Sequence, residues 1–208
     1  MARNGMATHQ KKTLRKMAYL VLLDESGLLM APLVRRTWAL RGHRPELYQK
    51  GKHREKVSLA AALWLSPTRD RLGLIYQTLI NDYFNNEQVA KFLELLMREI
   101  PAPLVVLWDR GNMHKGDPIR EEVRRFQPRL SLERLPPWAP MLDPVEPIFS
   151  WLKYGRLSNF APMNAHELNA RLLAELKPIR EDQVCLRNFW HASDLPLPKP
   201  LKKRTLLL

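Results

Sequence analysis

The chain has 208 residues, with 34 Lys and Arg against 21 Asp and Glu, which gives a formal net charge of +13. This length suits one domain, and an apolar content of 45% is enough for a packed core, so a disordered chain is excluded. The single cysteine excludes an internal disulfide framework and a cysteine-only zinc site. We therefore expect a basic globular protein of the reducing cytoplasm that binds nucleic acid and does not enter a membrane.

The N-terminal region contains the first expected strands. Residues 1–16 are basic and lack an apolar period, which predicts a flexible lead-in. An apolar run over residues 17–23 stops at Asp24 and predicts a buried strand. Glu25-Ser26-Gly27 is typical of a turn, and residues 28–34 predict a second strand, so we expect a hairpin here.

Strand and helix patterns alternate along the rest of the chain. Strands are expected at residues 57–65, 72–79, 104–108 and 130–135, and helices at 85–99, 117–126, 143–154, from 164 onward, and at 181–191. This order predicts an α/β domain with a mixed sheet and helices on its faces. We expect the domain to span residues 17–192 and a proline-rich, basic tail to follow over residues 193–208.

Three acidic residues are placed where rigid elements begin or end. Asp24 and Asp109 directly follow apolar strand patterns, and Glu146 lies near a helix start that is entered through the proline-rich residues 135–140. Judged singly, each has an ordinary explanation, because Asp often caps a turn and Asp143 to Glu146 has the spacing of a capping box.

Taken together, the three carboxylates in a basic chain suit the cleavage of a phosphodiester. Two Mg²⁺ ions roughly 4 Å apart can activate an attacking water or 3′-hydroxyl and stabilise the leaving oxygen. Mg²⁺ prefers hard oxygen ligands such as carboxylates and phosphate oxygens. The pattern therefore predicts a divalent-metal site formed by Asp24, Asp109 and Glu146.

Four segments in this order resemble the catalytic domain of DDE-type transposases, specifically the mariner-like superfamily of bacterial insertion sequences. They are Leu-Leu-Asp-Glu-Ser-Gly at 22–27, residues 36–45, Val-Leu-Trp-Asp at the start of 106–115, and residues 135–146 followed by Trp-Leu-Lys at 151–153. The 37 positions between Asp109 and Glu146 are also close to the spacing of that superfamily. The similarity covers about residues 17–160.

The resemblance implies a ribonuclease H-like fold with a five-stranded mixed sheet flanked by helices. It implies a catalytic metal triad of Asp24, Asp109 and Glu146, two Mg²⁺ or Mn²⁺ ions, nicking at transposon ends, strand transfer into target DNA, and a homodimer. His114, five residues after Asp109, occupies a position typical of the family. Both an accessory catalytic role and a structural hydrogen bond near a helix start remain open for it.

The sequence also departs from the family pattern. Arg110 and Asp143 both stand where members often have Asn. Arg110 could compete with a metal ion or hold a DNA phosphate, whereas Asp143 is expected to cap its helix equally well. Only about sixteen residues precede the first strand, too few for the helix-turn-helix modules of relatives. The chain could be a separately encoded second half, a truncated remnant or one partner of a split transposase, and an upstream DNA-binding partner chain is one possibility.

Residues 35–56 are irregular and strongly basic and form the expected DNA-contact segment. Its cations would neutralise phosphates, and its aromatic side chains would stack on unpaired bases. The expected DNA-binding residues are Arg35, Arg36, Trp38, Arg41, Arg44, Lys52, Arg54 and Arg110. The alternative is a solvated loop that Trp38 anchors to the core. Trp151 is expected to pack against the sheet.

Three functions are compatible with this pattern. An active transposase is favoured because acids occupy all three positions. The alternatives are a catalytically inactive DNA-binding remnant of a transposase and another nuclease with the ribonuclease H-like fold.

Overall fold

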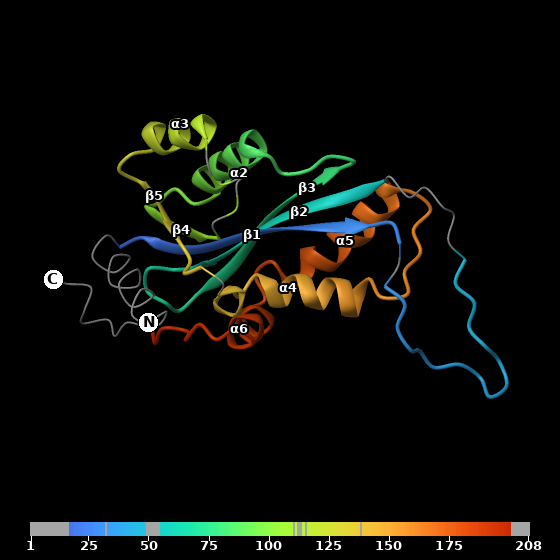
Figure 1. Cartoon of the computed structure of the whole chain (residues 1–208). Coiled ribbons are helices and arrows are strands. Elements are labelled where there is room, and N and C mark those ends of the chain that lie inside the picture. Colours follow the sequence, from blue (N-terminus) through green and yellow to red (C-terminus); the bar gives the residue numbers. More distant parts are fainter. Residues whose placement is uncertain are drawn as a thin grey trace.

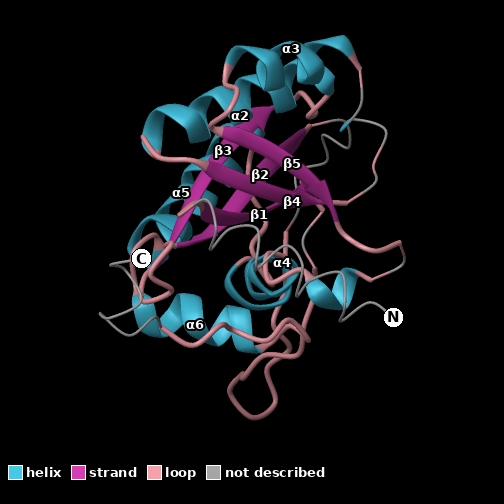
Figure 2. Ribbon diagram, turned by 90° about the vertical axis from the view of Figure 1, so that its left-hand side faces the viewer, coloured by secondary structure: helices cyan, strands magenta, loops and turns pink. Residues whose placement is uncertain are grey.

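The computed structural model describes residues 17–31, 33–48, 55–109, 111, 114, 116–137 and 139–200. Its centre is a five-stranded sheet in the order β3-β2-β1-β4-β5 (Figures 1 and 2). β2 pairs antiparallel with β1 and β3, whereas the β1–β4 and β4–β5 pairs are parallel. The strands are β1 (Tyr19–Leu29), β2 (Lys56–Leu65), β3 (Leu72–Ile80), β4 (Leu104–Trp108) and β5 (Leu130–Arg134). The expected five-stranded mixed sheet is confirmed.

Helices cover both faces of the sheet. In Figure 1, α2 and α3 lie above the strands and α4, α5 and α6 lie below them. These helices are α2 (Asn86–Glu99), α3 (Asp117–Arg125), α4 (Glu146–Trp151), α5 (Ala165–Ile179) and α6 (Gln183–His191). A 3₁₀ turn, Pro140–Leu142, precedes α4, and a π-helical segment, Leu152–Arg156, continues it. Among the described residues, no helix has the length and apolar character needed to span a membrane.

The central strands are apolar on both faces because a helical layer covers each face. In β1, Leu20 and Leu22 belong to the core beneath α4, α5 and α6, whereas Val21 and Leu23 belong to the core beneath α2 and α3. All five residues of β4 are buried. A continuous apolar run therefore correctly indicates these two strands, whereas alternating apolar and polar residues would be typical of a sheet with one solvent-exposed face.

The predicted hairpin at residues 25–34 is wrong. β1 runs without interruption from Tyr19 to Leu29, and Glu25, Ser26 and Gly27 pair with residues 58–60 of β2. The turn propensity of Ser-Gly is overridden because the ten-residue β2 pairs along the full length of β1. As a result, the first strand extends past Asp24 instead of ending there.

The helix starts follow the sequence in some places and not in others. The helices expected from residues 85 and 164 are present, and the side chains of Asn85 and Asn164 accept hydrogen bonds at the starts of α2 and α5. The N-cap of α3 is Gly116, one residue before the expected Asp117. The helix expected from Asp143 begins at Glu146, because Asp143 instead accepts a hydrogen bond from the Val145 N–H at 2.9 Å and closes a turn. Beyond α6, Leu195 is buried, and its carbonyl accepts from the Trp190 indole.

Candidate active site

Parallel pairing of β1 and β4 brings the first two predicted acids to the same edge of the sheet. Leu22 of β1 is in register with Leu107 of β4, and Asp24 and Asp109 each follow two residues later. Glu146 reaches the same place as the first residue of α4. β4 ends at Trp108, whereas β1 continues past Asp24 to Leu29, so the acids meet beside β1 at the carboxyl end of β4. Ligands of sheets with parallel strands bind at the carboxyl ends of the strands.

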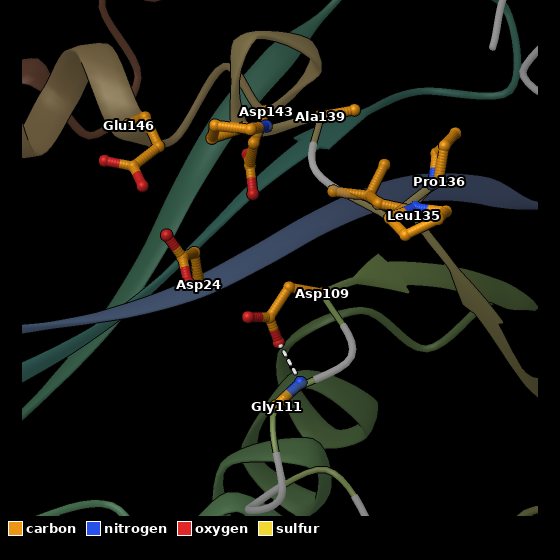
Figure 3. A pocket seen from close by; sticks show the side chains of 10 residues that line it. Asp24, Asp109, Gly111, Leu135, Pro136, Ala139, Asp143 and Glu146 are labelled. Carbon is orange, nitrogen blue, oxygen red and sulfur yellow. Dashed lines mark hydrogen bonds between the residues drawn. The ribbon is translucent and has the colours of Figure 1, made fainter.

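The three predicted acids line one cavity of about 510 Å³. Figure 3 shows the carboxylates of Asp24, Asp109 and Glu146 directed into a common space, together with a fourth from Asp143. The remaining wall is mostly apolar and comes from the proline-rich approach to α4. It contains Gly111, Leu135, Pro136, Pro137, Ala139 and Pro140.

Asp143 is the cavity residue that sequence reasoning misses. Its side chain is expected to cap a helix, but the residue is only 4% exposed and its carboxylate faces the cavity. The Asp-Pro pair is a common turn or cap signal, so no separate pattern in the sequence indicates a buried acid. Its position three residues before Glu146, just after a 3₁₀ turn, is the one available clue.

The cavity holds four acidic side chains whose negative charge no basic residue of its described lining compensates. Burial, followed by the charge of Asp143, raises the pKa of Asp24 to about 9. Burial likewise raises the pKa of Asp143 to about 7, with the charges of Glu146 and Asp109 adding to the effect. The described residues that line the cavity include no Lys, Arg or His. Buried carboxylates without a compensating cation favour either protonation or the binding of a positive ion.

The donor set fits a hard divalent cation, but the acids are not gathered as tightly as ligands. Carboxylate oxygens on rigid elements are the ligands that Mg²⁺ and Mn²⁺ prefer. Within the described part of the chain, no three His, Cys, Asp or Glu side chains lie close enough together to hold one metal ion. A bound cation would therefore have to draw the four carboxylates of the cavity inward.

His114 is buried behind this cavity and does not line it. Its Nδ1 lies 2.7 Å from Oδ1 of Asp109, and its Nε2 lies 3.1 Å from both carboxylate oxygens of Glu25. Burial disfavours the charged imidazole, but the hydrogen bond and charge of Glu25 and the charge of Asp109 outweigh it and raise the pKa of His114. Of the two roles open for His114, structural hydrogen bonds are present: they reach the Glu25 carboxylate and, at 3.3 Å, the backbone carbonyl of Asp109, a predicted catalytic acid.

The predicted DNA-contact residues lie mainly on a long extended segment, residues 33–48, which we call the arm. Figure 1 shows it on the right, reaching away from the sheet and helices. Every described residue of the arm is exposed, including Arg35, Arg36, Arg41 and Arg44. Trp38 is 100% exposed, so the alternative in which it anchors the loop to the core is wrong. The remaining candidates, Lys52, Arg54 and Arg110, lie outside the described residues.

The base of the arm is attached to the segment that follows α4. The Asn159 N–H donates to the Leu33 carbonyl at 3.0 Å, and the Arg35 N–H donates to Oδ1 of Asn159 at 2.7 Å. The Arg35 guanidinium lies 5.3 Å from the centre of the Tyr154 ring. Nearby, Trp151 packs edge-to-face on Phe189 of α6 and against the core cluster that the sheet shares with α4, α5 and α6.

Comparisons with known proteins agree with this architecture. Three solved structures share the fold: the Mos1 strand transfer complex (TM-score 0.60, 15% identity), the Mos1 paired-end complex with the left transposon end (0.57, 17%) and the catalytic domain of Mos1 mariner transposase (0.55, 16%). The matches cover 92%, 91% and 92% of this chain and 56%, 56% and 84% of the respective Mos1 chains. The chain thus spans just over half the length of the Mos1 chains in the complexes.

These structural matches confirm the expected ribonuclease H-like fold. No curated protein matches the sequence at a significant level. The family model of the DDE superfamily endonucleases matches residues 19–169, which include Asp24, Asp109 and Glu146. The chain belongs to the DDE superfamily of endonucleases.

Proposed function

We propose that this chain is the catalytic domain of a DNA transposase that nicks phosphodiesters and joins a 3′-hydroxyl end to target DNA. The observation that carries the proposal is the cavity into which Asp24, Asp109 and Glu146 direct their carboxylates from β1, the end of β4 and α4. Membership of the DDE superfamily supports the same reaction class. The similar Mos1 structures include a paired-end complex and a strand transfer complex, which correspond to the two stages proposed here.

Asp24, Asp109 and Glu146 would hold two Mg²⁺ or Mn²⁺ ions, and Mos1 complexes have been described with each of these metals. When bound, the ions supply charge stabilisation for the attacking and leaving oxygens. Asp109 contributes an oxygen that faces the cavity, and Asp24 and Asp143 bring charge that burial makes costly without a cation. The apolar wall of Leu135 and the prolines limits water around the reacting phosphate.

The arm would supply much of the DNA affinity. Arg35, Arg36, Arg41 and Arg44 are exposed and can neutralise phosphates, and the fully exposed Trp38 can stack on an unpaired base. The same proposal includes Lys52 and Arg54, which follow the arm in the sequence, and Arg110, which follows Asp109. We also propose that the domain works in the cytoplasm as a homodimer on paired DNA ends and that a separate DNA-binding module selects those ends.

A cleavage assay tests the proposal. Purified protein is incubated with supercoiled plasmid in Mg²⁺ or Mn²⁺, and nicked circles are counted for the wild type and for Asp109→Asn. We expect metal-dependent nicking by the wild type and none by the variant, with equal DNA binding. Wild-type protein that binds DNA but never nicks it would indicate an inactive remnant.

A second assay separates transposition from other nuclease activity. A short duplex with a labelled 3′-hydroxyl end is offered together with a target plasmid, and covalent joining is followed on a denaturing gel. Joined product supports the transposase, whereas nicking without joining favours another ribonuclease H-like nuclease.

A further inference from the structure

His114 connects two acids that come from different strands. Glu25 lies on β1, one residue after Asp24, and Asp109 follows the end of β4. The imidazole lies between them, with Nδ1 facing Asp109 and Nε2 facing Glu25. The His114 side chain is 1% exposed and that of Glu25 is 11% exposed, so water cannot readily replace the contact between them, whereas the Asp109 side chain is 60% exposed on its cavity side.

The plane of the His114 ring is fixed independently of these hydrogen bonds. It stacks on Trp108, with a centroid separation of 4.4 Å and an angle of 7° between the planes. Trp108 is itself buried as the last residue of β4. The ring therefore keeps both nitrogens directed at their carboxylate partners.

The contacts at Asp109 leave its two oxygens unequal. Oδ1 accepts from the Gly111 N–H at 2.7 Å and faces Nδ1 of His114 at 2.7 Å. Figure 3 shows the hydrogen bond to Gly111 and the other oxygen directed into the cavity. Nδ1 also lies 3.3 Å from the backbone carbonyl of Asp109 and can hydrogen-bond to it. With one short hydrogen bond and one close ion-pair contact already at Oδ1, Oδ2 is the oxygen left for the cavity.

Gly111 contributes to this arrangement because it lacks a side chain. A Cβ at this position would lie 3.0 Å from Oδ1 of Asp109 and 3.6 Å from Nδ1 of His114. Contacts of 3.0 Å are tighter than side chains normally tolerate, so a substitution would press on the Asp109 carboxylate. His114, through a polar contact, and Gly111, through its close approach, thus hold the Asp109 carboxylate in one orientation.

We propose that His114 is a positioning residue. Its hydrogen bonds to Glu25 and its close contact with Oδ1 of Asp109 turn Oδ2 of Asp109 alone toward the cavity and reserve Glu25 as the partner of the imidazole. Asp109 then offers a cation one oxygen, and Glu25 is withheld from the ligand set although it adjoins Asp24. This inference rests on the proposed metal-dependent function. Partners that orient a metal ligand typically change metal affinity by roughly 10–100-fold when removed.

The test compares Mn²⁺ binding by four proteins, measured by electron paramagnetic resonance without DNA. His114→Phe keeps a flat ring against Trp108 but removes both nitrogens, and Gly111→Ala keeps His114 but crowds Asp109. His166→Phe is the matched control, because His166 is an exposed histidine on α5. We expect the dissociation constant for Mn²⁺ to rise about 10–100-fold in the first two variants and to stay unchanged in the control.

Cleavage kinetics give a second measurement that a purely structural role would not reproduce. In His114→Phe, the Mn²⁺ concentration for half-maximal nicking should rise by the same factor, while the rate at saturating Mn²⁺ recovers toward the wild-type rate. Combining His114→Phe with Gly111→Ala should cost less than the product of the single effects, because both act on Asp109. Glu25→Gln retains an acceptor oxygen for Nε2 and should be the mildest of the variants.

The outcomes separate failure of this inference from failure of the proposed function. If the wild type binds no Mn²⁺ and nicks nothing, both are wrong. If the wild type binds Mn²⁺ and nicks DNA, but folded His114→Phe and Gly111→Ala bind Mn²⁺ equally well, only the positioning role is wrong. Should His114→Phe fail to fold, Gly111→Ala decides the question, since wild-type Mn²⁺ affinity in that variant contradicts the inference.

Discussion

The acidic cavity and the arm differ in both charge and exposure. The cavity gathers four carboxylates, of which Asp143 is 4% exposed, and its described lining contains no basic residue. The arm consists of exposed residues, four of them arginines, and contains the fully exposed Trp38. A net charge of +13 therefore describes the arm and the general surface, but not the place where chemistry is proposed.

This separation indicates that the arm would bind DNA and that the cavity would cleave it. Exposed cations bind the DNA backbone with little dependence on sequence and lose affinity as salt rises. Buried acids are poor partners for DNA by themselves, since both carry negative charge, and they become useful when a cation lies between them and a phosphate. Binding and cleavage should thus respond to different substitutions.

Replacing an acid of the cavity should have the largest effect. In Asp24→Asn, we expect the nicking rate to fall on the order of 10³-fold, because the variant loses a metal ligand worth several kcal/mol of charge stabilisation. DNA affinity should change little, since the arm is untouched. The free energy of unfolding at pH 8 should not fall, because burial raises the pKa of Asp24 to about 9 and opposes its charged form. Single-turnover nicking, DNA titration and thermal melts test the three parts.

Removing the positive charges of the arm should lower DNA affinity and leave the nicking rate nearly unchanged, the reverse of the Asp24→Asn result. Converting Arg35, Arg36, Arg41 and Arg44 to Gln should reduce the slope of log affinity against log salt by up to about 3–4. Affinity at 150 mM salt should fall by roughly 10²-fold. Single-turnover nicking at saturating DNA should remain within about threefold of the wild type, as the cavity is intact. A loss of saturated nicking would contradict the division of work between the two regions.

The sequence is sufficient to place Asp24, Asp109 and Glu146 near one another because each lies in or directly after a rigid element. Apolar runs on two parallel strands and a proline-rich helix entry are local patterns in the sequence. Parallel pairing of β1 and β4 then brings the acids that follow these patterns to one cavity. Pairing over a long sequence separation is not a local pattern. The continuous β1 escapes prediction because its partner β2 begins at Lys56, far from the apparent turn at Gly27.

The surroundings of the acids are less predictable for the same reason. His114 and Glu25 are 89 positions apart, and no spacing rule connects them. The burial of Asp143 depends on how the 3₁₀ turn before α4 packs, which a capping signal does not report. Local patterns thus locate the acids themselves, whereas the contacts that set their orientation and pKa depend on the tertiary fold.

Trp38 provides a smaller test confined to the arm. Trp38→Ala should leave the free energy of unfolding within about 0.5 kcal/mol of the wild type, because the side chain is fully exposed. Affinity for DNA with an unpaired end should fall by about 1–3 kcal/mol, the value of one stacked base. Thermal melts and titration with blunt and frayed duplexes check both parts. Equal losses on blunt and frayed DNA would argue against stacking on unpaired bases.

Asp143→Asn should change the free energy of unfolding by about 1–3 kcal/mol, in a direction that depends on pH. The pKa of Asp143 is about 7 in the folded protein, above its ordinary value of 3.8. Below about pH 3, both the folded and the unfolded states hold most of this proton, so variant and wild type should be similarly stable. As pH rises to 7, the unfolded state releases the proton first, and the wild type loses stability relative to the variant.

Above pH 7, this loss should be complete, because Asp143 is then charged in both states. The amide that replaces the carboxylate in Asp143→Asn keeps an acceptor oxygen for the Val145 N–H, so the turn before α4 is preserved. Denaturant unfolding at pH 4 and pH 8, with a chelator present, measures the difference. A variant that is less stable than the wild type at pH 8 would show that the Asp143 carboxylate is well compensated, and the contrast between an unbalanced cavity and a cationic arm would then be overstated.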